Sequence, residues 1–271
     1  MLRLSLLLSF IFLVPQVLSA NVATFEVYSQ SMSKSVPNSI ILPKGYSAEG
    51  RPLPVMYALH GATDDHTFWP TIVPKIKALA DQYGIIVVCP DGAKTSWYID
   101  SPIDPKFQYE TYITQELVNY VDKHFNTQSD KASRAIMGLS MGGFGAFYLG
   151  IRNSNVYSAA TSTSGGFDLR PFPNNWDIAK RIGSQAQYPA NWENYSVVNM
   201  AALLKNKSLA LFFDIGVDDF FYNANQEFHQ TLESMHIPHS YLEMPGGHTL
   251  AYWQKSINYH FVFLDEHFKS N

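Results

Sequence analysis

Residues 135–146 read Ala-Ile-Met-Gly-Leu-Ser-Met-Gly-Gly-Phe-Gly-Ala, and this stretch decides the fold. Its apolar start predicts a buried strand and its glycine-rich end predicts the start of a helix, with Ser140 at the bend between them. Side chains two positions before and after the serine would collide in a tight bend, and both positions, Gly138 and Gly142, are glycine. Free N–H groups at the start of the helix would stabilise negative charge beside the serine hydroxyl. A G-x-S-x-G motif alone is a weak signal, so the rest of the chain has to support it.

A serine hydroxyl becomes a strong nucleophile only when a base takes its proton, and the base needs a carboxylate to hold its tautomer. Where the serine occupies a strand-to-helix bend, the order along the chain is Ser, Asp, His. Here Ser140 is followed by Asp214, Asp218 and Asp219 at the end of a predicted strand, and then by His248. The order fits a catalytic triad, and all three aspartates are candidates for its acid.

The composition describes a globular chain that is long enough for one large domain or two small ones. The chain has 271 residues, of which 46% are hydrophobic and 15% are charged, and its formal net charge is -4. This charge gives no reason to expect nucleic acid or an anionic membrane surface as a partner. We find no internal repeat and no low-complexity segment.

The N-terminus differs in kind from the rest of the chain. A short basic start precedes the apolar run Leu4–Val14, and small residues follow it up to Ala20. This order is typical of a secretory signal peptide, and the run is shorter than the ~20 apolar residues of a membrane-spanning helix. We therefore expect a signal peptide at 1–20, a mature domain at 21–271 with no stable membrane insertion, and a secreted or periplasmic location. An uncleaved anchor is the alternative.

Short apolar runs alternate with amphipathic segments along the mature chain. Two edge strands are predicted within 23–42, and buried strands at 55–59, 85–89, 134–138, 156–163, 209–215 and 239–244. Helices are predicted at 69–83, 109–125, 221–235 and 249–268, with another directly after Ser140. This alternation predicts an α/β fold with a mostly parallel central sheet and helices on both faces. The polar and aromatic segment 165–207 has little strand character and predicts a small cap or lid insertion.

Seven motifs together resemble the esterase D branch of the α/β-hydrolase family, which includes tributyrin-type esterases, S-formylglutathione hydrolases, and acetyl and feruloyl esterases. In chain order they are Leu59-His60-Gly61, Pro90-Asp91-Gly92, Trp97-Tyr98, Tyr109-Glu110, Gly138-Leu139-Ser140-Met141-Gly142-Gly143, Asp218-Asp219-Phe220 and Pro245-Gly246-Gly247-His248. They span nearly all of the mature chain in the family's order, so the match is specific as a set. The loop at 93–107 and the segment at 165–207 are variable parts of the family.

The resemblance implies a role for each residue of the site. Ser140 would be the nucleophile and His248 the general base. The family places its acid directly before the phenylalanine, which selects Asp219. The oxyanion hole would consist of the backbone N–H groups of Met141, just after the nucleophile, and Ala62, just after His60-Gly61. Neither a metal nor an organic cofactor is implied.

Four tryptophans lie in predicted loops or helix starts near the carboxyl edge of the sheet, and we identify them as candidate substrate-binding residues: Trp69, Trp97, Trp176 and Trp192. Their alternative role is packing of the core or anchoring of the loops.

A denser cluster of polar residues contains His60, Asp64, Asp65 and His66. It lacks the H-E-x-x-H or Cys/His spacing of known metal sites. We therefore expect no metal there, and we expect His60 to brace the oxyanion loop.

The expected function is that of a secreted serine carboxylesterase that hydrolyses short-chain or carbohydrate-linked acetyl or feruloyl esters through an acyl-enzyme on Ser140. The alternatives are acyl transfer to a sugar, an S-formylglutathione hydrolase-like thioesterase, and a non-catalytic carbohydrate-binding protein on a hydrolase fold. The expected partner is a small-molecule or carbohydrate ester. A homo-oligomer is possible.

Overall fold

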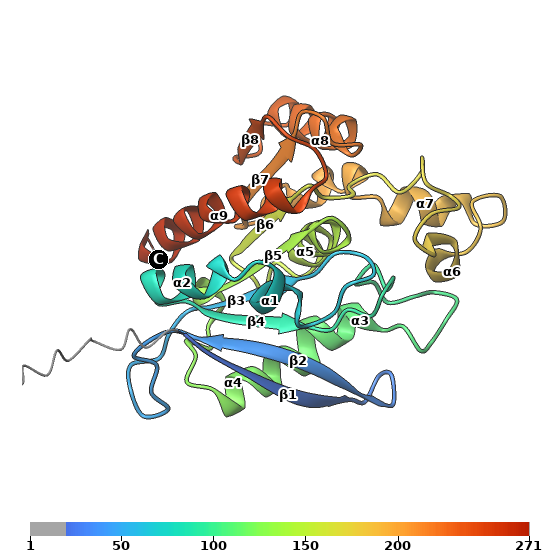
Figure 1. Cartoon of the computed structure of the whole chain (residues 1–271). Coiled ribbons are helices and arrows are strands. Elements are labelled where there is room, and N and C mark those ends of the chain that lie inside the picture. The colour runs from blue at the N-terminus through green and yellow to red at the C-terminus, as the bar shows by residue number, and fades with distance from the viewer. Residues whose placement is uncertain (1–19, 271) are drawn as a thin grey trace, which may run out of the picture.

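A computed structural model describes residues 20–270 (Figure 1). The predicted signal peptide falls on residues 1–20 and lies, except for its last residue, outside the described residues. None of the described helices is both long and apolar enough to cross a membrane.

The described residues form strands and helices that alternate along most of the chain. The strands are β1 (Asn21–Ser29), β2 (Lys34–Leu42), β3 (Val55–Leu59), β4 (Ile86–Pro90), β5 (Arg134–Leu139), β6 (Ala159–Thr163), β7 (Ala210–Gly216) and β8 (Ser240–Met244). The α-helices are α1 (Phe68–Ile72), α2 (Lys75–Tyr83), α3 (Tyr109–Thr111), α4 (Val118–His124), α5 (Met141–Arg152), α6 (Ile178–Ile182), α7 (Pro189–Tyr195), α8 (Tyr222–Ser234) and α9 (Leu250–Ser270). Shorter helical segments are the π-helical η1 (Tyr112–Leu117) and the 3-10 helices η2 (Lys131–Ser133), η3 (Val197–Asn199) and η4 (Ala201–Leu204).

The eight strands form one mixed sheet in the order β1-β2-β4-β3-β5-β6-β7-β8. The first three of these strands pair antiparallel and the other neighbours pair parallel. The register sets Gly138 of β5 beside Leu59 of β3 and Ser162 of β6. The predicted α/β fold with a mostly parallel sheet is therefore confirmed, and residues after several parallel strands meet at one edge.

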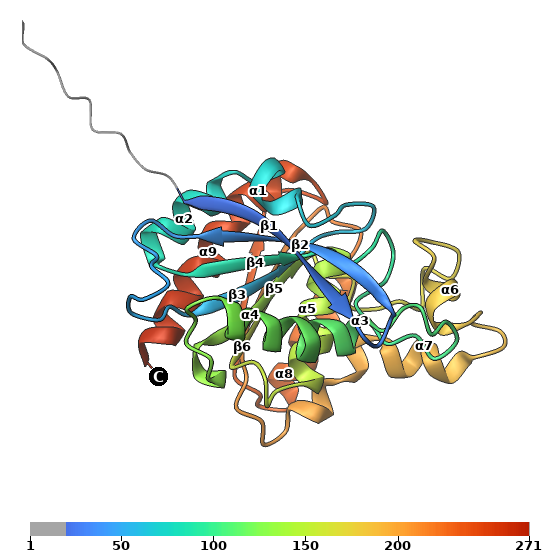
Figure 2. The same cartoon turned by 90° about the horizontal axis from the view of Figure 1, so that it is seen from below.

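The central strands are buried on both faces, as their continuous apolar runs predict. In β3, Val55, Tyr57 and Leu59 pack into one hydrophobic cluster, while Met56 and Ala58 pack into another. Helices α1, α2 and α9 cover one face of the sheet, and α4, α5 and α8 cover the other (Figures 1 and 2). This three-layer arrangement leaves the carboxyl edge of the parallel strands open for a site.

The single helix predicted at 69–83 is wrong, because the chain forms α1 and α2 with a break between them. Pro74 disfavours helical geometry in the residue before it, and Val73 accordingly adopts φ -118° and ψ 62°. Within the helix predicted at 109–125, the π-helical segment η1 lies between α3 and α4, a detail that the apolar spacing does not reveal.

The segment 165–207 contributes no strand to the sheet and carries α6, α7, η3 and η4. Helices α6 and α7 lie apart from the sheet, near the end where the parallel strands finish (Figures 1 and 2). The last part of the segment packs on the helices of the main domain, since η3 and η4 both contact α5 and α8 and bury Val197, Val198, Ala201 and Leu204 there. Only the middle of the segment is therefore a cap over the carboxyl edge.

Candidate active site

Ser140 occupies the bend between β5 and α5, with φ 54° and ψ -120°. A non-glycine residue rarely adopts a positive φ, and such strain is often retained at functional sites. A Cβ on Gly138 would lie 2.0 Å from the carbonyl oxygen of Gly142, and a Cβ on Gly142 would lie 2.3 Å from the carbonyl oxygen of Leu59. The predicted need for glycine on both sides of the serine is confirmed, because any side chain there would overlap backbone atoms.

Three side chains from three separate loops form a continuous chain of hydrogen bonds. The Nε2 atom of His248 lies 2.9 Å from Ser140 Oγ, and its Nδ1 atom lies 2.9 Å from Asp219 Oδ2 and 3.1 Å from Asp219 Oδ1. Because a carboxylate only accepts, the Nδ1–H donates to Asp219, and Nε2 is left to accept the proton of the serine. Asp219 is buried and also accepts the backbone N–H of Phe221 at 2.9 Å. This arrangement can activate a serine hydroxyl.

The structure separates the three candidate aspartates. Asp219 alone contacts His248. The side chain of Asp218 is exposed, and its backbone N–H bonds the carbonyl of Gly246. Asp214 is fully buried on β7 and bonds residues of β6 and α9 instead. The geometry agrees with the choice of Asp219 that the family resemblance implies.

The loop with Gly61 and Ala62 approaches the serine from the end of β3. A Cβ on Gly61 would lie 3.6 Å from Ser140 Cβ and 2.8 Å from the side chain of Leu139. No protein acceptor within residues 20–270 takes the N–H of Ala62. The N–H of Met141, at the first position of α5, has no partner within its own helix. Both groups are therefore available to an oxyanion next to Ser140 Oγ.

His60 fixes this loop through hydrogen bonds to backbone groups. Its Nδ1 lies 2.7 Å from the carbonyl oxygen of Gly61, and its Nε2 accepts the backbone N–H of Gly92 at 2.8 Å. The Tyr98 hydroxyl donates to the carbonyl of His60 at 3.0 Å. Burial lowers the pKa of His60, so the ring is neutral and donates from Nδ1. These contacts agree with the bracing role predicted for His60.

The other polar residues of the His60 cluster have separate partners. The Asp65 carboxylate accepts the N–H and the hydroxyl of Thr67, and His66 Nδ1 lies 2.8 Å from Ser39 Oγ. Burial raises the pKa of Asp64. In the part of the chain that the structure describes, no three His, Cys, Asp or Glu side chains converge as metal ligands would.

For three of the four tryptophans, the predicted contact with substrate is wrong, because Trp69, Trp97 and Trp192 are at most 2% exposed. The indole N–H of Trp69 donates to the carbonyl of Leu59, and that of Trp192 donates to the carbonyl of Gly183. Trp97 donates to the carbonyl of Trp176 at 3.0 Å and thereby supports it. Trp176 alone is partly exposed and belongs to the aromatic group beside the triad.

The sequence analysis does not predict the aromatic residues that lie next to the triad. The ring of Phe220 lies 4.3 Å from that of His248 and is stacked on Trp176, with 5.9 Å between centroids. The rings of Phe221 and Trp253 meet His248 edge-on at 5.5 Å and 5.1 Å. Phe220 directly follows Asp219, so its position after the acid was a usable signal. Trp253 gave none, since it lies within a long helix.

Known proteins share both the sequence pattern and the fold. A family profile described as "Putative esterase" matches residues 29–264. An esterase of Mycobacterium tuberculosis is 29% identical over 236 residues, which cover 78% of this chain and 52% of that protein. An acetyl esterase of Caldicellulosiruptor saccharolyticus is 23% identical over 88% of this chain and 96% of that protein. A ferulic acid esterase structure superposes with a TM-score of 0.77 at 26% identity, covering 92% of this chain and 100% of that one.

The match extends over most of this chain but not over all of its relatives. The chain spans about half the length of the mycobacterial esterase, 52%. The family profile, in contrast, starts within β1 and ends within α9, so it includes Ser140, Asp219 and His248. This chain therefore belongs to the esterase family that the profile describes.

Proposed function

We propose that this protein is a serine carboxylesterase that works through an acyl-enzyme on Ser140. One observation carries the proposal: Ser140, His248 and Asp219 form a hydrogen-bonded series, and the loop of Gly61 and Ala62 packs close to Ser140 with the Ala62 N–H unpaired among the described residues. A binding protein without catalysis has no use for a strained serine whose hydroxyl bonds an imidazole.

The first half-reaction follows from this geometry. Ser140 Oγ attacks the carbonyl carbon of the ester while its proton passes to Nε2 of His248, 2.9 Å away. The carbonyl oxygen gains negative charge, which the N–H groups of Ala62 and Met141 stabilise. The buried Asp219 stabilises the imidazolium through Nδ1–H. When the C–O bond to the alcohol breaks, the alcohol oxygen takes the proton from Nε2.

The second half-reaction uses the same groups in the same order. A water molecule gives a proton to His248 Nε2 and attacks the acyl carbon, and the oxyanion forms again beside Ala62 and Met141. The bond to Ser140 Oγ then breaks, the serine regains its proton, and the acid leaves. Each step needs only water and groups of this chain.

We propose short acyl esters and carbohydrate-linked acetyl or feruloyl esters as substrates. The ring of Phe220 lies beside that of His248 and is 53% exposed, and Trp176 stacks on Phe220. Val217, on the loop before Asp219, and Leu250, the first residue of α9, are also exposed. Apolar and aromatic surface of this kind favours small apolar acyl groups and the flat faces of sugar or phenolic rings.

A secreted or periplasmic location is also proposed, on the signal-like pattern of the N-terminal residues. Sequencing the N-terminus of protein recovered from culture medium or periplasm tests this location. A mature protein that starts at Met1 would contradict it.

The enzyme activity is tested with a panel of esters from p-nitrophenyl acetate to longer acyl chains and methyl ferulate. We expect measurable turnover with the short acyl esters. A fluorophosphonate probe should label Ser140 stoichiometrically, as peptide mass spectrometry would show, because it reacts with an activated serine. No turnover on any ester, or labelling of a serine other than Ser140, would contradict the proposal.

A further inference from the structure

A separate cavity of about 190 Å³ lies behind Phe220. It is lined by Asp168, Pro171, Phe172, Phe220, Phe221, Asn223, Ala224 and Glu227, and neither Ser140 nor His248 contributes to it. The ring of Phe220 belongs to both places, since it also lies 4.3 Å from the ring of His248. The cavity therefore adjoins the triad with one aromatic ring between them.

The apolar side of the cavity is built from packed aromatic rings. Phe172 meets Phe221 edge-on, with 5.3 Å between ring centroids, and Phe220 meets Phe221 at 4.5 Å. Phe221 is buried, whereas Phe220 is largely exposed. Rings fixed in this way offer a preformed apolar surface to the C–H face of a flat or cyclic ligand.

The polar side carries hydrogen-bonding groups that no protein group occupies. Asn223 and Glu227 are exposed on α8, and among residues 20–270 their side chains make no hydrogen bond or ion pair. A carboxylate accepts hydrogen bonds only, while an amide both donates and accepts. The two together match hydroxyl groups, which do both.

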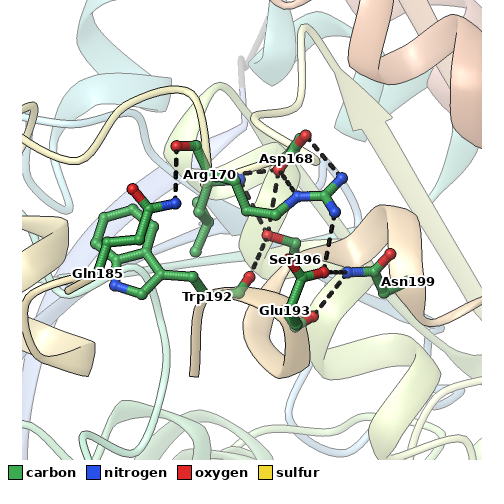
Figure 3. Close-up of polar contacts among 8 residues, drawn as sticks. Asp168, Arg170, Gln185, Trp192, Glu193, Ser196 and Asn199 are labelled. Atoms are coloured by element: carbon green, nitrogen blue, oxygen red, sulfur yellow. Dashed lines mark hydrogen bonds and ion pairs between the residues drawn. The ribbon is translucent and has the colours of Figure 1, made fainter. Parts of the chain in front are cut away.

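The third polar residue, Asp168, is held rigidly by the cap (Figure 3). Arg170 donates to it from Nε at 2.8 Å and from Nη2 at 3.0 Å, and Arg170 is in turn fixed by Glu193 at 2.9 Å. Among the described residues, Asp168 Oδ2 accepts a hydrogen bond only from Arg170, so it has a lone pair left for a ligand hydroxyl. Because Pro171 and Phe172 follow directly, the same clamp sets the aromatic side of the cavity.

We propose that this cavity binds a second, neutral sugar unit of a carbohydrate ester, next to the unit whose ester reaches Ser140. The inference rests on the proposed esterase function. The volume lies below the roughly 300–1,000 Å³ of pockets for drug-sized ligands and suits a single ring. Arg170 balances the charge of Asp168, and the free amide of Asn223 favours hydroxyl groups over a cation.

The test compares kcat/KM for two substrates, monoacetylated xylose and monoacetylated xylotriose. We expect the longer ester to be the better substrate of the wild-type protein. Phe172→Ala should lower the ratio of kcat/KM for the xylotriose ester to kcat/KM for the xylose ester by about five- to tenfold, the effect of one lost aromatic contact. Glu227→Gln should lower it by about two- to tenfold. Glu233→Gln, a control on the same helix but outside the cavity, should leave the ratio unchanged.

Calorimetric titration of xylotriose into the Ser140→Ala variant separates this inference from the esterase function, because binding needs no turnover. Failure of the wild type to hydrolyse p-nitrophenyl acetate would contradict the esterase function. The titration would still show whether the cavity binds xylotriose. Phe172 is partly buried and its removal could unfold the cap, whereas Glu227 is exposed and keeps the test valid. The inference is wrong if xylotriose does not bind or if Glu227→Gln leaves the ratio unchanged. It is also wrong if Glu227→Gln lowers the rate with choline esters, which carry a cation, and not with sugar esters.

Discussion

The molecule contains two clusters of the same three residue types, one at the rim of the sheet and one in its core. Ser140, His248 and Asp219 form the rim cluster. The core cluster consists of Ser256 and His260 on α9 and Asp214 on β7. Both contain bonds of similar length between serine, histidine and aspartate, so the residue types alone do not show which cluster is catalytic.

The clusters differ in which histidine nitrogen makes each bond. At the rim, His248 uses Nδ1 for the carboxylate and Nε2 for the serine, so a proton can move from the serine to the ring. In the core, Nε2 of His260 faces both Asp214 Oδ2 at 2.8 Å and Ser256 Oγ at 3.1 Å. The other nitrogen, Nδ1, has no partner among the described residues. A single nitrogen cannot both donate to the carboxylate and accept from the serine.

Burial separates the two clusters as well. The side chain of His248 is 15% exposed, whereas His260, Ser256 and Asp214 are 0% exposed and no substrate can reach them. The core cluster instead joins elements: Thr163 of β6 also donates to Asp214, at 3.0 Å. It thereby fixes α9, which carries Trp253, and the indole of Trp253 meets His248 edge-on. The core cluster supports the rim cluster and does not duplicate it.

The largest expected contrast between the clusters is at their serines. Ser140→Ala should abolish ester hydrolysis, with a loss of about 10⁶-fold in kcat as in other serine hydrolases, and leave the melting temperature nearly unchanged. Ser256→Ala should keep most of the activity and cost about 1–3 kcal/mol of stability, because buried Asp214 loses one donor. Steady-state kinetics and thermal unfolding of both variants measure this contrast. Retention of more than a few per cent of activity in Ser140→Ala would refute the assignment.

The aspartates should show the same contrast, loss of activity at the rim and loss of stability in the core, with a smaller effect on activity. Asp219→Asn should lower kcat by about 10⁴-fold, since an amide favours the wrong tautomer of His248. Asp214→Asn should mainly destabilise the fold, by about 3 kcal/mol or more, because it breaks a buried network. Asp218→Asn, in an exposed neighbour, is the matched control and should resemble the wild type. A crippled Asp218→Asn with an active Asp219→Asn would reverse the assignment.

Much of the rim site could be predicted from the sequence because its geometry is local or linked to strand ends. The glycines around Ser140 report the sterics of one bend, and chain order in a parallel sheet predicts an aspartate and His248 at the same edge. The choice of Asp219 among three aspartates came from the family resemblance. The core cluster could not be predicted in this way. Its bonds join β7 to α9, and Ser256 and His260 read as ordinary residues of an amphipathic helix.

The prediction that Trp69, Trp97 and Trp192 contact the substrate failed for a related physical reason. A tryptophan in a loop can turn its ring toward the solvent or into the core, and the sequence does not encode the direction. Trp192 packs inside the cap through the carbonyl of Gly183, whereas Trp176 lies on the outer side, stacked on Phe220. Trp176 has φ 45°, an unusual backbone conformation that no composition or periodicity predicts.

A third contrast therefore compares Trp176, near the rim, with Trp192, which is buried inside the cap. Trp176→Ala should lower kcat/KM unequally among esters, with the largest loss for aromatic or sugar esters and a small change in melting temperature. Trp192→Ala should cost about 3–5 kcal/mol of stability, as is usual for removal of a buried tryptophan, and affect all esters alike. The ester panel and thermal unfolding measure both effects. An equal loss on every ester in Trp176→Ala would make its role one of packing.

The smallest expected effect concerns His60, which is buried like His260 but lies beside the oxyanion loop. Burial lowers its pKa from the ordinary value of 6.5. Above that value the ring is neutral in both the folded and the unfolded chain, so pH does not change its contribution. Below it, the unfolded chain binds a proton that the folded chain refuses, so stability falls as the pH falls toward the lowered pKa.

Thermal unfolding of the wild type and of His60→Asn between about pH 7 and pH 5 isolates this contribution. The slope of stability against pH should be shallower in the variant, by at most about 1.4 kcal/mol per pH unit, the limit for one titrating group. Burial also lowers the pKa of His267, but that group is present in both proteins, and its contribution cancels in the difference. Parallel curves would mean that His60 takes up a proton as readily in the folded protein as in the unfolded chain. A neutral ring would then not be what fixes the carbonyl of Gly61 and, through it, the direction of the Ala62 N–H.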